Sequence, residues 1–156
     1  MGAKTPLEVP WTSFNSTALF TEEMKNGNIE KEYVAVIEGV LNPKNGKIDA
    51  PIKRKSEKGI ARCVAPDGKR AVTLYETLKS NEIYSLVKLC PITGRTHQLR
   101  VHMSYMKCPI YGDRMYSAEE DERTLLHCKK LCFTHPATKE KIAVEAPIPE
   151  DIKKYD

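Results

Sequence analysis

The sequence predicts an α+β domain, with a mainly antiparallel mixed sheet and a few short flanking helices. Strand-like segments outnumber helical ones, and tight turns join most neighbouring strands, which favours antiparallel pairing. The 156 residues allow one domain and leave little room for two.

The chain starts with an expected irregular arm over residues 1–14, which lack apolar periodicity. The domain itself is expected over 15–156. A helix is predicted over about 15–26, because its apolar residues fall roughly on one face and Gly27 supplies an end.

The first predicted strand is Glu32–Leu41, which is rich in β-branched and aromatic residues. Residues 42–46 form a turn by composition, and a short strand over Lys47–Ile52 follows. The next stretch, 53–61, is basic and contains glycine, so we expect a loop there.

The middle of the chain predicts a hairpin between two strands, Ala71–Leu78 and Tyr84–Leu89, after a turn at 66–68. A turn at 91–94 then leads into a helix over 96–106. Later elements are expected at Leu125–Thr134 and Ile142–Ala146 (strands) and at Pro149–Tyr155 (a short helix).

Charge and composition limit the function without deciding it. Twenty-five basic and 21 acidic residues give a net charge of +4, which is compatible with a nucleic-acid partner. No apolar run approaches the roughly 20 residues that span a bilayer. Because the N-terminus resembles no signal peptide, we expect a cytoplasmic protein without a membrane partner.

The five cysteines are odd in number and irregular in spacing, which indicates reduced thiols. His127, Cys128, Cys132 and His135 invite a zinc interpretation. They lack the closely spaced ligand pairs of zinc sites, and they would alternate between the two faces of a strand. We therefore expect no metal there.

The segment 91–102, Pro-Ile-Thr-Gly-Arg-Thr-His-Gln-Leu-Arg-Val-His, carries the most chemistry. It places Arg95, His97, Arg100 and His102 where a turn opens a helix with Thr96 as cap. Free backbone N–H groups at a helix start favour anions. The residues alone leave two interpretations open, an anion or phosphate site and a solvated basic face with His102 satisfied by a neighbour.

Several motifs occur together in one order. Lys31-Glu32-Tyr33 precedes an apolar strand, and further segments follow at Lys88–His102, Pro109–Tyr116, Leu125–His127 and Phe133–Pro136. In this combination, over about residues 16–149, the chain closely resembles the RluA family of RNA pseudouridine synthases. The resemblance implies a pseudouridine-synthase-like fold.

The resemblance implies that the family's reaction, the conversion of uridine to pseudouridine in structured rRNA or tRNA, applies here without metal or organic cofactor. The target base would be flipped into a pocket. Tyr33 matches the tyrosine beside that base, a candidate for proton transfer. Arg100 matches the arginine that pairs with the catalytic aspartate, and Leu99 matches the aliphatic residue of the uracil pocket.

For the other basic residues, both a structural role and a role in RNA contact remain open. Arg95 and His97 would orient the loop or contact RNA phosphate. The run Lys53, Arg54, Lys55 and Lys58 is either a solvated loop or a track for the phosphate backbone. Within the motif at 109–116, Asp113 is expected to cap or pair locally.

The chain departs from the family at the catalytic aspartate. The family's His-Arg-Leu-Asp segment is expected before the helix at 15–26, yet the residues there contain no aspartate, histidine or arginine. The chain therefore resembles the C-terminal two-thirds of a catalytic domain. We expect it to be inactive unless another chain supplies the segment; the alternative is a non-catalytic RNA-binding module.

Two structural expectations follow from this departure. Arg100 should acquire another counter-charge (from Glu8 or a second chain), an anion from solution, or access to water, because an unpaired buried charge is costly. Free sheet edges would be available to a second copy or a complementing chain, so oligomer formation is a hypothesis.

Overall fold

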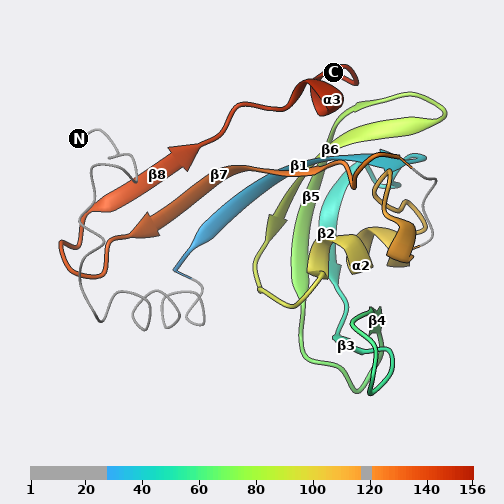
Figure 1. Cartoon of the computed structure of the whole chain (residues 1–156), viewed down its shortest axis with the longest axis horizontal. Coiled ribbons are helices and arrows are strands. Elements are labelled where there is room, and N and C mark those ends of the chain that lie inside the picture. Colours follow the sequence, from blue (N-terminus) through green and yellow to red (C-terminus); the bar gives the residue numbers. More distant parts are fainter. Residues whose placement is uncertain (1–27, 117–120) are drawn as a thin grey trace.

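The structure, a computed structural model, describes residues 28–116 and 121–156 (Figure 1). Within these residues, six strands form one sheet in the order β2-β5-β6-β1-β7-β8, and β3 pairs with β4 in a small separate hairpin. Every pairing between these strands is antiparallel, which confirms the predicted fold class. The predicted arm at 1–14 and the predicted helix at 15–26 lie outside the described residues.

The elements largely follow the expected order. The strands are β1 Glu30–Glu38, β2 Asn45–Asp49, β3 Ile52–Arg54, β4 Arg62–Val64, β5 Val72–Ser80, β6 Tyr84–Pro91, β7 Leu126–Thr134 and β8 Lys141–Glu145. The helices are α2 Gln98–Tyr105, the 3-10 turn η2 Arg114–Tyr116 and α3 Glu150–Lys153.

Strand β1 is buried on both sides, because each face of the sheet packs against a different layer. On one face Ala35, Ile37 and Leu89 contact Leu99 and Met103 of α2. On the opposite face Val34, Val36 and Leu86 form a second cluster with Leu125 and with Ile152 of α3. The two-residue alternation of a strand explains why neighbouring β1 residues join different clusters.

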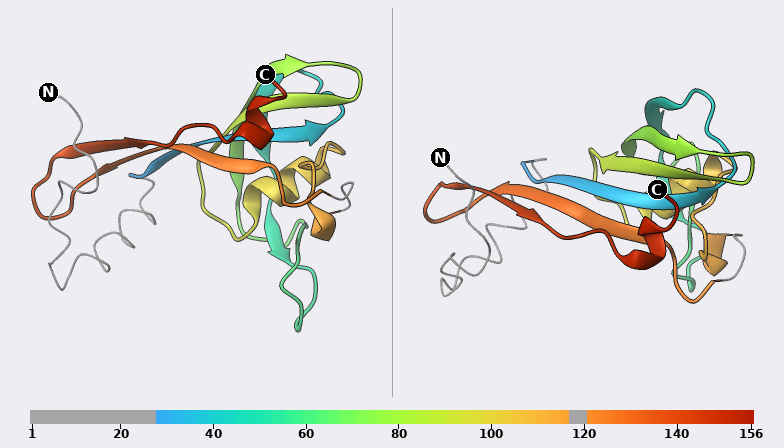
Figure 2. Two further views of the ribbon diagram at one scale, coloured as in Figure 1. Left: turned by 45° about the horizontal axis from the view of Figure 1, so that its top comes forward. Right: turned by 90° about the horizontal axis from the view of Figure 1, so that it is seen from above.

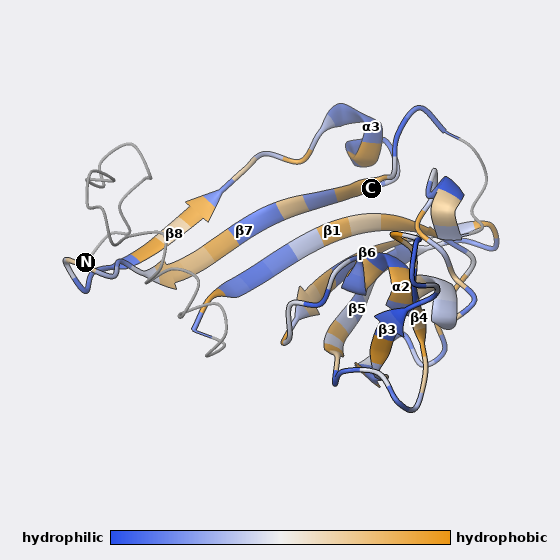
Figure 3. Ribbon diagram, turned by 60° about the horizontal axis from the view of Figure 1, so that its bottom comes forward, coloured by the Kyte–Doolittle hydropathy of each residue, from blue (hydrophilic) through white to orange (hydrophobic). Residues whose placement is uncertain are grey.

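Strands β7 and β8 extend well beyond the body of the domain (Figure 2). Along β7 a hydrophilic block at Lys129 and Lys130 is followed by a hydrophobic block over Leu131–Phe133 (Figure 3). At the far end Phe133 and Ile142 are buried, with Ile29, Leu131 and Val144 packed against them. This small cluster is separate from the two main ones.

Several predicted boundaries were wrong. The predicted strand Lys47–Ile52 is divided between β2, which ends at Asp49, and β3, which begins at Ile52. The segment 53–61 is not entirely loop, because Lys53 and Arg54 pair with Cys63 and Arg62 across the β3–β4 hairpin. Pro91 belongs to β6 rather than to the next turn, since it lies opposite Thr73 at the strand's end. A proline is tolerated there because the pairing of β6 with β1 ends at Leu89, so no hydrogen bond to β1 is required of Pro91.

The predicted helix cap was also wrong. Helix α2 begins at Gln98, its N-cap is His97 with φ 55°, and no side chain caps it. The Gln98 Oε1 atom instead accepts hydrogen bonds from the Arg95 backbone N–H at 3.0 Å and the Thr93 hydroxyl at 2.6 Å. The amide oxygen thereby organises the preceding loop, so Thr96 is not needed as the cap.

A series of buried hydrogen bonds between side chains holds α2 against the sheet. Gln98 Nε2 donates to Thr73 Oγ1 at 3.0 Å, the Thr73 oxygen lies 2.8 Å from His102 Nδ1, and His102 Nε2 lies 2.9 Å from the Ala50 carbonyl. Because a carbonyl only accepts, Nε2 carries the imidazole proton and Nδ1 accepts from Thr73. His102 is thus a neutral histidine with both ring nitrogens hydrogen-bonded. This agrees with the second interpretation of the segment 91–102, in which a neighbour satisfies His102.

We predict that acidification destabilises the protein through His102. Burial lowers the pKa of this fully buried imidazole below its ordinary value of 6.5. The stability that neutral His102 contributes is fully present above pH 6.5, the ordinary pKa of histidine. It is lost as the pH falls from there toward the pKa of the folded state, because the unfolded chain binds the proton first. Urea unfolding at about pH 7.5 and about pH 5.5 measures this loss. His102→Gln should show a smaller difference between the two pH values, and an unchanged difference would contradict the prediction.

Among the described residues, no helix has the length and apolar character needed to cross a bilayer.

Candidate active site

One pocket brings together five of the residues singled out from the sequence. It has a volume of about 200 Å³ and lies where β1, the loop after β6, and α2 meet. Its lining includes Tyr33, Arg95, His97, Leu99 and Arg100. The rest of the lining comes from Lys31, Pro91, Thr93, Gly94, Gln98 and Leu126.

Arg100 is held by a forked ion pair with Asp113. Its Nε and Nη2 atoms each donate to one carboxylate oxygen at 2.8 Å. The Asp113 side chain is fully buried, whereas Arg100 retains 24% exposure. The carboxylate raises the pKa of Arg100 above its usual value. The arginine is therefore charged, oriented and open to the pocket.

This pair supplies the counter-charge expected for Arg100. The partner is Asp113, for which local pairing was predicted, while Glu8 lies outside the described residues. The positions lie close because the chain reverses after α2 through Ile110 and Gly112. Gly112 has φ +81°, and a side chain there would collide with the Arg123 carbonyl. The turn thus requires glycine just before Asp113.

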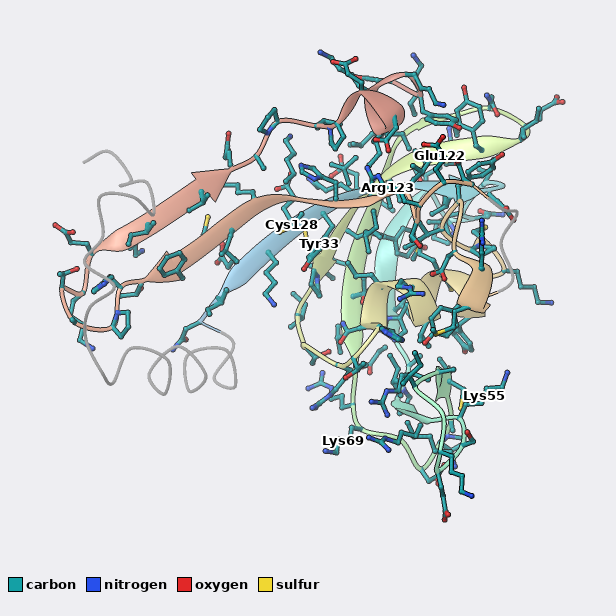
Figure 4. All side chains as sticks on the ribbon, in the orientation of Figure 1. Tyr33, Lys55, Lys69, Glu122, Arg123 and Cys128 are labelled. Atoms are coloured by element: carbon teal, nitrogen blue, oxygen red, sulfur yellow. The ribbon has the colours of Figure 1, made fainter. Side chains whose placement is uncertain are left out.

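Tyr33 faces the pocket from β1 and is half-buried. It lies directly opposite Cys128 of β7 (Figure 4). Burial raises the pKa of the Tyr33 phenol, and the facing Cys128 raises it further. The phenol is therefore protonated at neutral pH and presents both a hydrogen-bond donor and a π-face.

His97 is tied to Tyr116. The Tyr116 hydroxyl accepts from the Arg62 backbone N–H at 3.0 Å and lies 2.7 Å from His97 Nδ1. Burial lowers the pKa of His97, and the nearby guanidinium of Arg100 lowers it further. His97 is therefore neutral near pH 7. The Arg100 guanidinium lies 5.1 Å from the centre of the Tyr116 ring, so one tyrosine contacts both pocket residues and the β3–β4 hairpin.

A second, larger pocket borders the first. It has a volume of about 550 Å³ and lies between the β3–β4 hairpin and the loop before α2. We call it the basic groove. Its cationic lining residues are Lys53, Arg54, Arg62, Lys69 and Arg95, and Asp67 is the acid among them.

The four predicted phosphate-contacting residues divide into two pairs. Lys53 and Arg54 line the basic groove, although Lys53 also pairs with Asp67 at 2.8 Å. Lys55 and Lys58 are exposed and do not line it. Figure 4 places Lys55 on the hairpin and Lys69 at its base. Arg95 borders both pockets and donates from Nε to the Arg70 carbonyl at 2.8 Å, so it connects them.

Sequence reasoning missed three contacts in this site. It gave no role to Tyr116 or Cys128, and it did not identify Asp113 as the partner of Arg100. The motif at 109–116 already contained Tyr116 and Asp113, which was the available signal. Cys128 entered only the zinc interpretation, and no pattern marked it as a neighbour of Tyr33, because that contact depends on how β7 aligns with β1.

Within residues 28–116 and 121–156, no group of three or more His, Cys, Asp and Glu side chains is arranged to hold a metal ion.

The fold is that of RNA pseudouridylate synthase domains. The solved structure of human RNA pseudouridylate synthase domain containing 1 aligns with a TM-score of 0.75 and 28% identity, covering 87% of this chain and 61% of that one. Human RNA pseudouridylate synthase domain containing 4 aligns with a TM-score of 0.74 and 26% identity, covering 90% and 66%.

A family model described as RNA pseudouridylate synthase matches residues 13–105, and the chain belongs to this family. The match confirms the family predicted from the motifs. A similar relative, the uncharacterized RNA pseudouridine synthase YjbO of Bacillus subtilis, is 40% identical over 139 residues, covering 88% of this chain and 49% of the relative.

Ribosomal large subunit pseudouridine synthase D of Vibrio parahaemolyticus is 37% identical over 145 residues, covering 83% of this chain and 44% of that protein. The chain thus spans about half the length of these two relatives.

Proposed function

We propose that this chain provides the uridine pocket and part of the RNA-binding surface of a pseudouridine synthase. The observation that carries the proposal is the pocket in which Tyr33 of β1 meets Leu99 and Arg100 of α2. The tyrosine supplies a face for stacking, the leucine an apolar wall, and the guanidinium a charge with fixed orientation.

The reaction breaks the bond between N1 of uracil and C1′ of ribose, joins C5 to C1′, and releases the hydrogen from C5. Tyr33 holds its proton at neutral pH and is positioned to donate or relay it beside the base. Arg100 uses Nε and Nη2 for Asp113, and its Nη1 makes no hydrogen bond to any residue that the structure describes. We propose that Nη1 donates a hydrogen bond to the family's catalytic carboxylate.

That carboxylate must come from elsewhere. The six aspartates of the sequence are Asp49, Asp67, Asp113, Asp121, Asp151 and Asp156, and none stands in a His-Arg-Leu-Asp context. Asp113 already serves as the orienting partner of Arg100. We therefore propose that the chain is catalytically inactive alone and acts when a segment carrying the aspartate is supplied.

The RNA partner is proposed to be structured rRNA or tRNA in the cytoplasm. A relative named for the ribosomal large subunit supports rRNA, and the basic groove beside the pocket supports a phosphate-backbone contact. The target uridine would leave its stack to enter the pocket.

The second candidate is a non-catalytic RNA-binding module. The pocket and the groove are both present, while none of the aspartates in the given sequence stands in the family's segment, and this combination favours it. Both candidates bind RNA. Only the first catalyses the isomerisation once the segment with the aspartate is supplied.

Tritium release separates the candidates. The chain would be incubated with bulk ribosomal and transfer RNA carrying 5-tritiated uridine, alone and with the N-terminal half of the Bacillus subtilis relative. We expect RNA binding in both cases and release in the mixture, with release lost in Tyr33→Phe. Binding without release in the mixture would favour the non-catalytic module, and no binding at low salt would overturn both.

A further inference from the structure

The alignment of β1 with β7 contains an irregularity beside Tyr33. Glu32 lies opposite Lys130, but the next β1 residue, Tyr33, lies opposite Cys128. One residue of β7, Lys129, is thereby left out of the pairing, which is the geometry of a β-bulge. Bulges next to active sites redirect a side chain, and here the redirected residue is the one facing Tyr33.

The bulge changes the chemistry opposite the phenol. In an unbroken pairing Lys129 would face Tyr33, and an ammonium there would favour the phenolate. With the bulge, Lys129 lies beside Glu32 at 3.9 Å, and a thiol faces the phenol instead. The Cys128 Sγ atom in turn donates to the Lys130 carbonyl at 3.7 Å, which fixes the direction of the thiol.

We infer that Cys128 is a positioning residue for Tyr33: the bulge places its sulfur to accept the phenol hydrogen bond and to hold the ring at the pocket wall. Cys128 does not line the pocket, so it acts through Tyr33. The inference rests on the proposed function of Tyr33 as the residue beside the base.

The surroundings of Tyr33 contain other charges. Lys31, Arg95, His97 and Arg100 line the same pocket, and each would favour the phenolate when charged. The thiol opposes this tendency, and it raises the pKa of Tyr33 together with burial. Burial and Cys128 therefore both favour the protonated phenol.

The exposure of Cys128 distinguishes it from the other cysteines. Cys128 is exposed, Cys63, Cys90 and Cys132 are partly buried, and Cys108 is buried. Replacing Cys128 thus removes little packing. Cys132 provides a matched control, because it lies on the same strand opposite Glu30 rather than Tyr33.

The test is a titration of Tyr33 in the whole chain. Tyrosine carrying ¹³C at the ζ carbon reports each phenol by NMR, and Tyr33→Phe identifies the Tyr33 signal. In Cys128→Ala we expect that signal to move at neutral pH and its titration midpoint to fall. Cys128→Ser retains an acceptor and should move the neutral-pH signal less, and Cys132→Ala should leave it unchanged. An unchanged Tyr33 signal and midpoint in Cys128→Ala would overturn the inference.

RNA binding gives a second, separate readout. Fluorescence anisotropy with a uridine-containing strand should show roughly fivefold weaker binding for Cys128→Ala, the effect of one lost hydrogen bond. Cys132→Ala should bind like the unaltered chain. If the unaltered chain binds no RNA, the proposed function fails while the titration still decides the inference. If it binds RNA and Cys128→Ala binds equally well, the positioning role is contradicted.

Discussion

Replacing Asp113 with asparagine is expected to lower the free energy of unfolding by about 3 kcal/mol. Removing one member of a buried ion pair costs about 3–5 kcal/mol, because the remaining charge has lost its partner. The lower end applies here, since Arg100 keeps 24% exposure and water compensates part of the loss. Urea unfolding of Asp113→Asn against the unaltered chain measures the difference.

Two further variants test the cause of this loss. Asp113→Asn combined with Arg100→Met should recover much of the stability, because no uncompensated charge remains. Asp67→Asn breaks the exposed pair with Lys53, where both side chains are well solvated, and should leave the unfolding free energy nearly unchanged. Equal losses for Asp113→Asn and Asp67→Asn would contradict the structural role assigned to the buried pair.

Removing the groove charges is expected to weaken RNA binding and its salt dependence. In Lys53→Ser/Arg54→Ser, the slope of log affinity against log salt should fall by about 1.4, or about 0.7 for each phosphate contact with single-stranded RNA. Titrations of a labelled RNA at several salt concentrations measure this slope.

The hairpin offers a matched control for this experiment. Lys55→Ser/Lys58→Ser removes the same charge from exposed positions that do not line the basic groove. We expect its slope and affinity to remain closer to those of the unaltered chain. Identical losses for the two double variants would mean that net charge, and not the groove, determines the affinity.

The sequence predicted the order of the elements because their signals are local. The apolar residues of β1 and the strand signal of β6 each depend on a few neighbouring residues. The start of α2 could not be predicted in the same way. The Gln98 side chain, and not that of Thr96, accepts the hydrogen bonds of the loop before the helix. Which side chain does so depends on how that loop folds back, and the helical pattern of the sequence does not predict this.

The pocket was predictable only through motifs and not through its contacts. Tyr33, Leu99 and Arg100 followed from the family resemblance, and the structure places them around one cavity. Asp113 was expected to pair locally. That its partner is Arg100 depends on the reversal of the chain at Gly112, which the sequence pattern does not reveal. Cys128 lies far from Tyr33 in sequence, and the bulge that joins them has no signature in either strand.

The proposal that a flipped uridine enters this pocket is tested most directly by methyl NMR during an RNA titration. Leu99 and Leu126 line the pocket, while Leu86 is buried on the opposite face of the sheet. With a uridine-containing strand we expect the Leu99 and Leu126 methyl signals to shift and the Leu86 signals to stay. The same strand with an abasic site in place of the uridine should leave all three unmoved. If the uridine strand binds and the Leu99 and Leu126 signals do not move, the base does not enter the pocket and the account is contradicted.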